Sequence, residues 1–225
     1  KADSSVTFSI PTKQVSAWTD QSGKDSNASQ STSSKQPLRY GYDGPKDKSQ
    51  IVFDGTDDMM MSDDLAPFDS GELSFFVVAK RTNATTEDQI IFSMDRTDTT
   101  VFTIGVFSEK LQGTAINGSA SLVVSSVVDN EEEWGIYYVQ LKKNSVSNYS
   151  LISSVNDDVE TTVSDAFSQN DYSTQQFQIG CTQDGGDDVF FFTGAVAEII
   201  GYDKAISSDE KTQVLRYLNN KYKIY

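Results

Sequence analysis

The chain has 225 residues, enough for one well-cored domain, and an all-β sandwich of this size commonly forms a single unit. With 33 Asp and Glu against 18 Lys and Arg, its net charge is −15, and it contains no His. Such a surface repels phosphate backbones and anionic lipid headgroups, so we expect no nucleic-acid partner and no membrane insertion. Divalent cations are favoured instead, whereas the absence of His removes the commonest general base and zinc ligand.

Cys181 is the only cysteine, so an internal disulfide framework is excluded. No apolar run approaches the length of a membrane span. Because the chain starts at Lys1 without Met and shows no second composition regime, we expect residues 1–225 to form a single domain of a larger protein.

The first part of the chain predicts two short strands, Val6–Ile10 and Val15–Trp18, followed by a long polar loop over 19–47. The segment Ile51–Met61 comes next, with two apolar runs around Asp54-Gly55-Thr56-Asp57-Asp58. An Asp-Gly pair between apolar runs is typical of a turn, so we expect a hairpin whose carboxylates collect at one rim of a sheet.

Leu73–Ala79 is a nearly continuous apolar run, as expected for a strand that is covered on both faces. In Val101–Phe107, alternation places Phe102, Ile104 and Val106 on one face. Further strands are predicted at 90–94, 122–128, 134–141, 148–155, 159–163, 177–179, 189–192 and 195–202, with a second acidic turn over 184–188.

Only the end of the chain has a helical pattern. Ser207 and Glu210 fit a capping box, and an apolar stripe follows at helical spacing, formed by Val214, Leu215, Leu218 and Tyr222. Many short strands and one terminal helix predict an all-β fold, a two-sheet antiparallel sandwich with one short C-terminal helix.

Several blocks of the sequence resemble the laminin-G-like jelly rolls of the concanavalin A-like lectin/glucanase superfamily. The blocks are Ala17–Gly23, Asn27–Gln30 leading to Gln36-Pro37, Val52–Asp58, Phe75–Lys80, Gly194–Asp203, Ala205–Ser207 and Tyr217–Tyr222. They cover both ends of the chain and leave roughly 114–177 poorly matched, apart from Trp134.

This resemblance implies a curved jelly roll, often with Ca²⁺ at a rim, as found in extracellular adhesion modules, bacterial surface proteins and phage structural proteins. Most such domains bind glycans or proteins and are not enzymes. The exceptions are glycoside hydrolases, which carry two Glu with an Asp between them on one strand. That motif is missing here, because the position two residues after Glu198 is Ile200, and Glu131 and Glu133 resemble a solvated turn.

The candidate Ca²⁺ ligands are the carboxylates of the two acidic turns, because Ca²⁺ takes several oxygen ligands that Asp-rich turns supply. They are Asp54, Asp57 and Asp58, with Asp63 and Asp64 just beyond, and Asp184, Asp187 and Asp188. The alternative is that these side chains only bond the backbone or face water.

Sugar recognition combines an exposed aromatic face with polar groups on loops. The candidates in polar surroundings are Tyr40, Tyr42, Tyr149 and Tyr172, whereas Trp18 and Trp134 are expected to pack in the core. Met59–Met61 fits a core strand better than an adhesive patch.

Together these features predict a non-catalytic recognition or adhesion module, outside the cell on a cell surface or a virion. It would bind glycan or a surface protein through rim loops, with Ca²⁺ as the one implied cofactor. The alternatives are a structural decoration or fibre domain that contacts other virion subunits, and a glycoside hydrolase.

Overall fold

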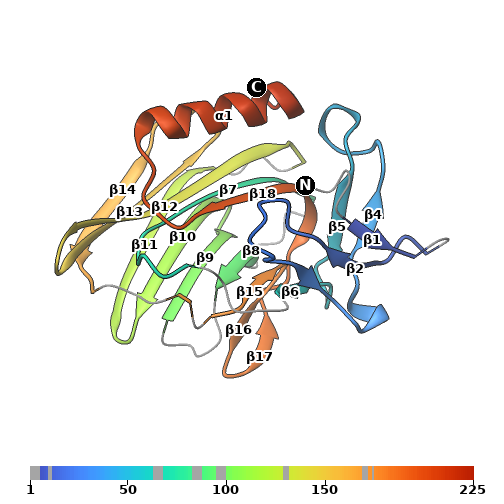
Figure 1. Ribbon diagram of the computed structural model, residues 1–225, viewed down its shortest axis with the longest axis horizontal. Coiled ribbons are helices and arrows are strands. Elements are labelled where there is room, and N and C mark those ends of the chain that lie inside the picture. Colours follow the sequence, from blue (N-terminus) through green and yellow to red (C-terminus); the bar gives the residue numbers. More distant parts are fainter. Residues whose placement is uncertain are drawn as a thin grey trace.

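Two antiparallel β-sheets packed face to face, with one helix on an outer face, form the fold in the computed structural model (Figure 1). The structure describes residues 6–9, 12–62, 68–82, 88–94, 100–128, 132–168, 172–173 and 175–225. Among these residues, no helix combines the length and apolar character needed to cross a membrane.

The larger sheet has nine strands and the smaller has seven. In spatial order, the nine-stranded sheet is β1 (Val6–Phe8), β2 (Val15–Trp18), β3 (Ala28–Ser29), β6 (Met60–Ser62), β15 (Phe177–Ile179), β8 (Gln89–Met94), β9 (Thr100–Phe107), β10 (Lys110–Asn117) and β11 (Ala120–Val128). The seven-stranded sheet is β14 (Thr161–Ala166), β13 (Asn148–Val155), β12 (Gly135–Ser145), β7 (Leu73–Arg81), β18 (Thr193–Tyr202), β5 (Gln50–Asp54) and β4 (Leu38–Tyr40). A separate hairpin joins β16 (Thr182–Asp184) to β17 (Asp187–Val189), and two short 3-10 turns are η1 (Ser33–Lys35) and η2 (Pro45–Asp47).

The main core lies between the two sheets. Phe102, Ile104 and Val106 of β9 all point into it, as the alternation predicts. From the opposite sheet, Phe75 and Val77 of β7 meet them, and the Phe75 and Phe102 ring centroids are 5.5 Å apart. The expected two-sheet antiparallel sandwich is therefore confirmed.

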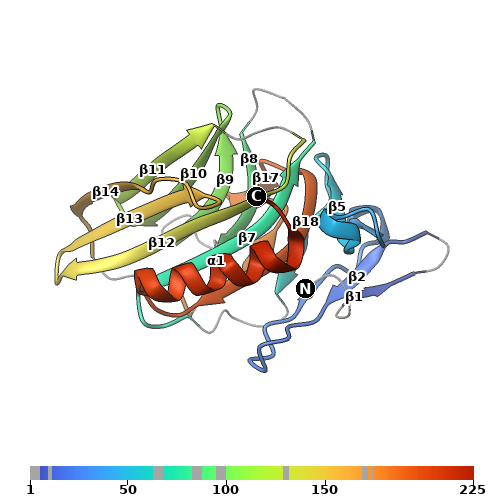
Figure 2. The same ribbon diagram turned by 90° about the horizontal axis from the view of Figure 1, so that it is seen from above.

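The single helix, α1 (Ser208–Tyr222), covers the outer face of the seven-stranded sheet (Figure 2). Its buried residues Leu215 and Leu218 pack in a second cluster with Phe76 and Val78, the outward residues of β7. This covering explains why β7 is apolar on both faces. The Ser207 capping box is confirmed, since its side chain accepts from the backbone N–H of Glu210 while the Glu210 carboxylate accepts from the Ser207 N–H.

The predicted hairpin at Ile51–Met61 is wrong. Its first arm, β5, belongs to the seven-stranded sheet, and its second arm, β6, belongs to the nine-stranded sheet. Phe53 and Met60 enter the same core from opposite sides. The turn is a corner between the sheets, and an Asp-Gly turn between apolar runs has the same local sequence pattern in either arrangement.

Candidate functional site

The acidic corner Asp54–Asp58 is held together by its own carboxylates. Oδ1 of Asp54 accepts from the backbone N–H of Thr56 at 2.8 Å, of Asp57 at 3.3 Å and of Asp58 at 3.4 Å. Oδ2 of Asp58 in turn accepts from the Asp54 N–H at 3.0 Å. The expected bonding of turn carboxylates to nearby backbone amides is therefore present.

These three side chains also concentrate negative charge. Carboxylate oxygens of Asp54, Asp57 and Asp58 lie within 4.8 Å of one another, and Asp58 is only 6% exposed. Burial and the neighbouring Asp54 and Asp57 charges raise the pKa of Asp58 to about 6, although its bond from the Asp54 N–H acts in the opposite direction. The donor set, three carboxylates at one corner, fits a hard cation such as Ca²⁺ in chemistry.

The second acidic turn does not join this group. Asp184 and Asp187 face each other across the β16–β17 hairpin, while Asp188 lies 3.5 Å from the Nζ of Lys35. In the part of the chain that the structure describes, Asp54, Asp57 and Asp58 are the one group of three or more acidic or thiol side chains close enough to share an ion. Asp63, Asp64 and Glu131 lie outside the described residues.

Two of the four candidate sugar-binding tyrosines are buried. Tyr149 and Tyr172 are 0% exposed, so the prediction of surface rings there is wrong. The Tyr149 ring packs 5.6 Å from Phe167, and the Tyr172 ring lies 6.3 Å from Phe102. Both rings lie in stretches rich in Ser and Asn, so the polarity of the local sequence did not indicate that they are buried.

The other two tyrosines reach the surface. Tyr42 is 83% exposed in the loop after β4, and Tyr40 is half-buried with the Lys13 ammonium 4.5 Å from its ring centre. Of the two tryptophans expected in the core, Trp18 is buried, and Trp134 is half-buried against the cluster beneath α1.

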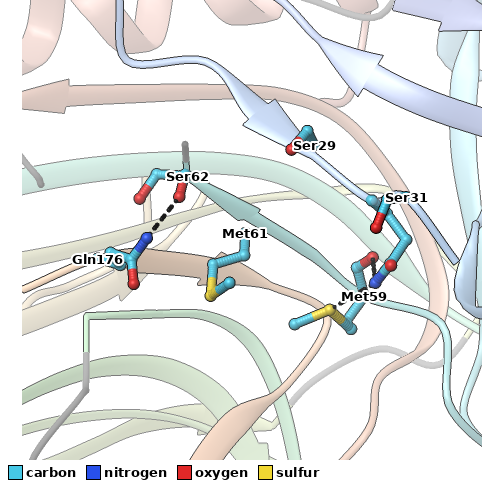
Figure 3. A pocket seen from close by; sticks show the side chains of 7 residues that line it. Ser29, Ser31, Met59, Met61, Ser62 and Gln176 are labelled. Carbon is cyan, nitrogen blue, oxygen red and sulfur yellow. Dashed lines mark hydrogen bonds between the residues drawn. The ribbon is translucent and has the colours of Figure 1, made fainter. Parts of the chain in front are cut away.

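A pocket of about 240 Å³ opens beside β3 and β6 (Figure 3). Seven uncharged residues line it: Ser29, Gln30, Ser31, Met59, Met61, Ser62 and Gln176. They come from three segments that are far apart in the sequence, so sequence reasoning missed the site. The available signal was the alternation within Met59–Met61, where Met60 points into the core and half-buried Met61 lines the pocket.

Hydrogen bonds shape the walls of this pocket. Nε2 of Gln30 donates to the carbonyl oxygen of Met59 at 3.3 Å and lies 2.9 Å from its Sδ, and Oε1 of Gln30 accepts from the Thr32 N–H. Nε2 of Gln176 donates to the Ser62 carbonyl at 2.9 Å, a bond visible in Figure 3. Both ends of the Gln30 side-chain amide are therefore already hydrogen-bonded within the pocket wall. The amide oxygen of Gln176, in contrast, makes no hydrogen bond to the described residues.

Two of the pocket residues, Ser29 and Met61, belong to an uncharged row on the outward side of the nine-stranded sheet, in which Gln178, Ser93 and Thr103 are buried. Strand pairing aligns Ser29, Met61, Gln178, Ser93, Thr103, Thr114 and Val123. These side chains share a face because their inward neighbours, such as Met60 and Phe102, fill the core. Gln178 is 1% exposed, and its Nε2 has no hydrogen-bond partner among the described residues.

Glu198 does not line this pocket, and its carboxylate is bonded to side chains of α1. Its Oε2 accepts from the Lys221 ammonium at 2.7 Å and from the Tyr222 hydroxyl at 2.8 Å, and its Oε1 accepts from the Tyr217 hydroxyl at 3.3 Å. Glu198 is therefore a carboxylate satisfied by basic and polar neighbours. It anchors α1 to the seven-stranded sheet.

No protein-family model matches the sequence, and no curated protein matches it. Solved structures do match. One is a heptameric SAP-like pentraxin from Limulus polyphemus, with a TM-score of 0.59, 16% identity and coverage of 74% of this chain and 81% of that one. A sialidase CBM40 from Ruminococcus gnavus bound to α2,3 sialyllactose has a TM-score of 0.50 and 14% identity, covering 64% of this chain and 82% of that one.

A structure of botulinum neurotoxin type C, whose cell entry depends on two ganglioside molecules, matches 92% of this chain and 51% of that one. Its TM-score is 0.57 at 11% identity. The NanB sialidase of Streptococcus pneumoniae also matches, at a TM-score of 0.52 and 16% identity, over 64% of this chain and only 24% of that one. These similarities show the fold alone, a jelly-roll sandwich, and both the concanavalin A-like and the laminin-G-like assignments stay predictions.

Proposed function

We propose that this chain is a non-catalytic recognition module that binds glycan through the outer face and rim of its nine-stranded sheet. The observation that carries the proposal is the pocket beside β3 and β6, because hydroxyls, amides and thioethers converge there on a solvent-open cavity. Polar groups of this kind fix the hydroxyls of a sugar, while the Met side chains offer an apolar surface to its C–H groups. Support comes from similarly folded proteins described with sialyllactose or gangliosides.

The described residues that line this pocket include no carboxylate pair, which supports a non-catalytic role. None of the seven lining residues carries an acid. A glycoside hydrolase needs two carboxyl groups on either side of the scissile bond. Glu198, the one carboxylate inside an apolar strand, is engaged by Lys221 and Tyr222 instead.

The proposal includes Ca²⁺ at the acidic corner. Asp54, Asp57 and Asp58 would hold it, and the raised pKa of Asp58 marks a concentration of negative charge that a cation relieves. Asp58 directly precedes Met59 of the pocket wall, so a bound cation would stiffen the corner from which that wall starts. We place the module outside the cell, on a cell surface or a virion.

A glycan array tests the proposal. The expected result is retention of a defined set of glycans, with loss of that binding when Met61→Trp fills the pocket. A domain that only assembles with other virion subunits, or one that recognises a surface protein, leaves the array blank. A blank array would therefore contradict the glycan proposal. Release of reducing ends from polysaccharides would contradict the non-catalytic part.

A further inference from the structure

The charge around the pocket decides which class of glycan it suits. All seven lining residues are uncharged, and in particular none is Arg or Lys. Buried or half-buried sites bind a carboxylate or sulfate by pairing it with a cation or with several N–H donors. An anionic sugar in this pocket would find no cationic partner among the described residues of its walls.

A cationic residue beside the pocket wall, Lys35, has its charge balanced. The carbonyl of Lys35 accepts from the Met59 N–H at 3.1 Å, which places this residue next to the pocket wall. Its ammonium, however, lies 3.5 Å from the Asp188 carboxylate. On the other side of Met59 stands Asp58 with the Asp54 and Asp57 carboxylates close to it. The local potential is therefore neutral to negative, and the net charge of −15 adds to it.

The polar groups available in the pocket suit hydroxyls. The amide oxygen of Gln176 and the hydroxyl of exposed Ser31 make no hydrogen bond with the described residues. One acceptor and one hydroxyl at the surface of the pocket form a set that pairs with neutral sugar hydroxyls.

The size of the pocket limits how much it encloses. Its volume of about 240 Å³ is below the roughly 300–1,000 Å³ of pockets that enclose drug-sized ligands. It would therefore enclose a single sugar unit and leave the rest of a longer glycan outside the pocket.

We propose that the pocket takes one neutral sugar unit and discriminates against sialylated, sulfated or otherwise anionic ones. This inference rests on the proposed glycan-binding function and specifies its ligand. It separates this chain from the CBM40 structure, which holds sialyllactose.

The test is an array of matched pairs, each neutral glycan beside its sialylated or sulfated form, with lactose and α2,3-sialyllactose as one pair. We expect each anionic form to bind at least about tenfold more weakly than its neutral partner, because its charge is desolvated without a partner. Stronger binding of the anionic forms overturns this inference and leaves the glycan-binding function standing. A blank array overturns the function itself.

Three variants locate the effect. Met61→Trp should weaken binding of the neutral form by about tenfold or more, with an unchanged melting temperature as proof of folding. Ser31→Arg adds a cation at the pocket and should reduce the difference in affinity between the neutral and anionic glycan forms. Ser34→Arg adds the same charge on an exposed residue outside the pocket lining and should leave this difference in affinity unchanged. Equal effects of the two Arg variants, or intact neutral binding by Met61→Trp, would overturn the assignment to this pocket.

Discussion

Glu198 is a structural carboxylate that joins α1 to the sheet, and its substitution separates structure from catalysis. Glu198→Gln removes the charge that faces the Lys221 ammonium and weakens the bond from the Tyr222 hydroxyl. We expect the free energy of unfolding to fall by about 1–3 kcal/mol, because a partly buried ion pair loses one partner.

Urea unfolding measures this change, with Glu109→Gln in the exposed β9–β10 turn as the matched control that leaves stability unchanged. Unchanged stability of Glu198→Gln, together with loss of polysaccharide hydrolysis by the protein, would restore the glycoside hydrolase alternative.

Asp58 makes the stability of the protein depend on pH in an unusual direction. Its pKa is raised from 3.8 to about 6 in the folded state, mainly by burial and then by the Asp54 charge. The folded protein therefore binds a proton more tightly than the unfolded chain, so the contribution of Asp58 to stability falls as pH rises through this window.

Asp58→Asn keeps an oxygen for the Asp54 N–H and removes the charge. We expect it to stabilise the fold by about 1 kcal/mol at pH 7, after allowance for solvent screening, and to have no such effect at pH 4. Thermal unfolding at the two pH values measures the difference. An equal effect at both values would show that the Asp58 charge is not the cause.

At the scale of elements, the corner from β5 to β6 depends on Gly55. Its φ is +77°, and an added Cβ would lie 1.8 Å from the Oγ1 of Thr193. In the β16–β17 hairpin, Gly185 has φ +60° and open space around the same position. A substitution at Gly185 would cause backbone strain alone, whereas one at Gly55 would cause backbone strain and a steric clash with Thr193.

Gly55→Ala should destabilise the fold by about 3 kcal/mol or more, and Gly185→Ala by about 1 kcal/mol. Adding Thr193→Ala to Gly55→Ala removes the colliding oxygen and should recover part of the loss. Denaturant midpoints of the three variants measure this. Equal losses at the two glycines would mean that Thr193 does not constrain the corner.

The same corner is the place to look for Ca²⁺. Millimolar CaCl₂ should raise the melting temperature of the protein, because binding to the folded state alone stabilises it. Asp57→Asn should remove this rise, since Asp57 contributes to the cluster without accepting any of the backbone bonds that close the turn. Asp187→Asn in the second acidic turn should keep it. A melting temperature that does not change when CaCl₂ is added would exclude the cation site.

Much of the element order could be predicted because alternation and apolar runs report burial directly. The strand Asn148–Val155 and the capped helix were predicted at their actual places. The strand β10 was not predicted, because Gly113 and Ala115 take inward positions where larger residues would have marked the pattern. An added Cβ at Gly113 would lie 2.7 Å from Val139, so the close approach of the sheets requires a small residue there.

The candidate site was predicted less well than the fold, since it depends on contacts between distant segments. The acidic corner was visible because its three carboxylates lie within five residues. The pocket was not, because Ser29, Met61 and Gln176 meet only after β3 and β6 pair and the chain returns through β15. No local pattern in any of the three segments indicates which residues of the other two segments it will contact.

At the scale of the whole molecule, the two outer faces have different roles. The helix α1 covers the outer face of the seven-stranded sheet, whereas the proposed glycan pocket lies beside β3 and β6 of the nine-stranded sheet. The β16–β17 hairpin lies on that second side, away from α1 (Figure 1), and the Ser93 hydroxyl donates to the Cys181 carbonyl just before it. Binding is therefore expected on the side opposite the helix.

Amide chemical-shift mapping by NMR, with the neutral glycan that binds best, tests the central claim that this outer-face pocket is the glycan site. We expect the largest shifts at the pocket residues Ser29, Gln30, Ser31, Met61 and Gln176, with α1 unaffected. Shifts confined to α1 or to the loop around Tyr42, with no shifts at the pocket residues, would contradict the assignment of the glycan site to this pocket.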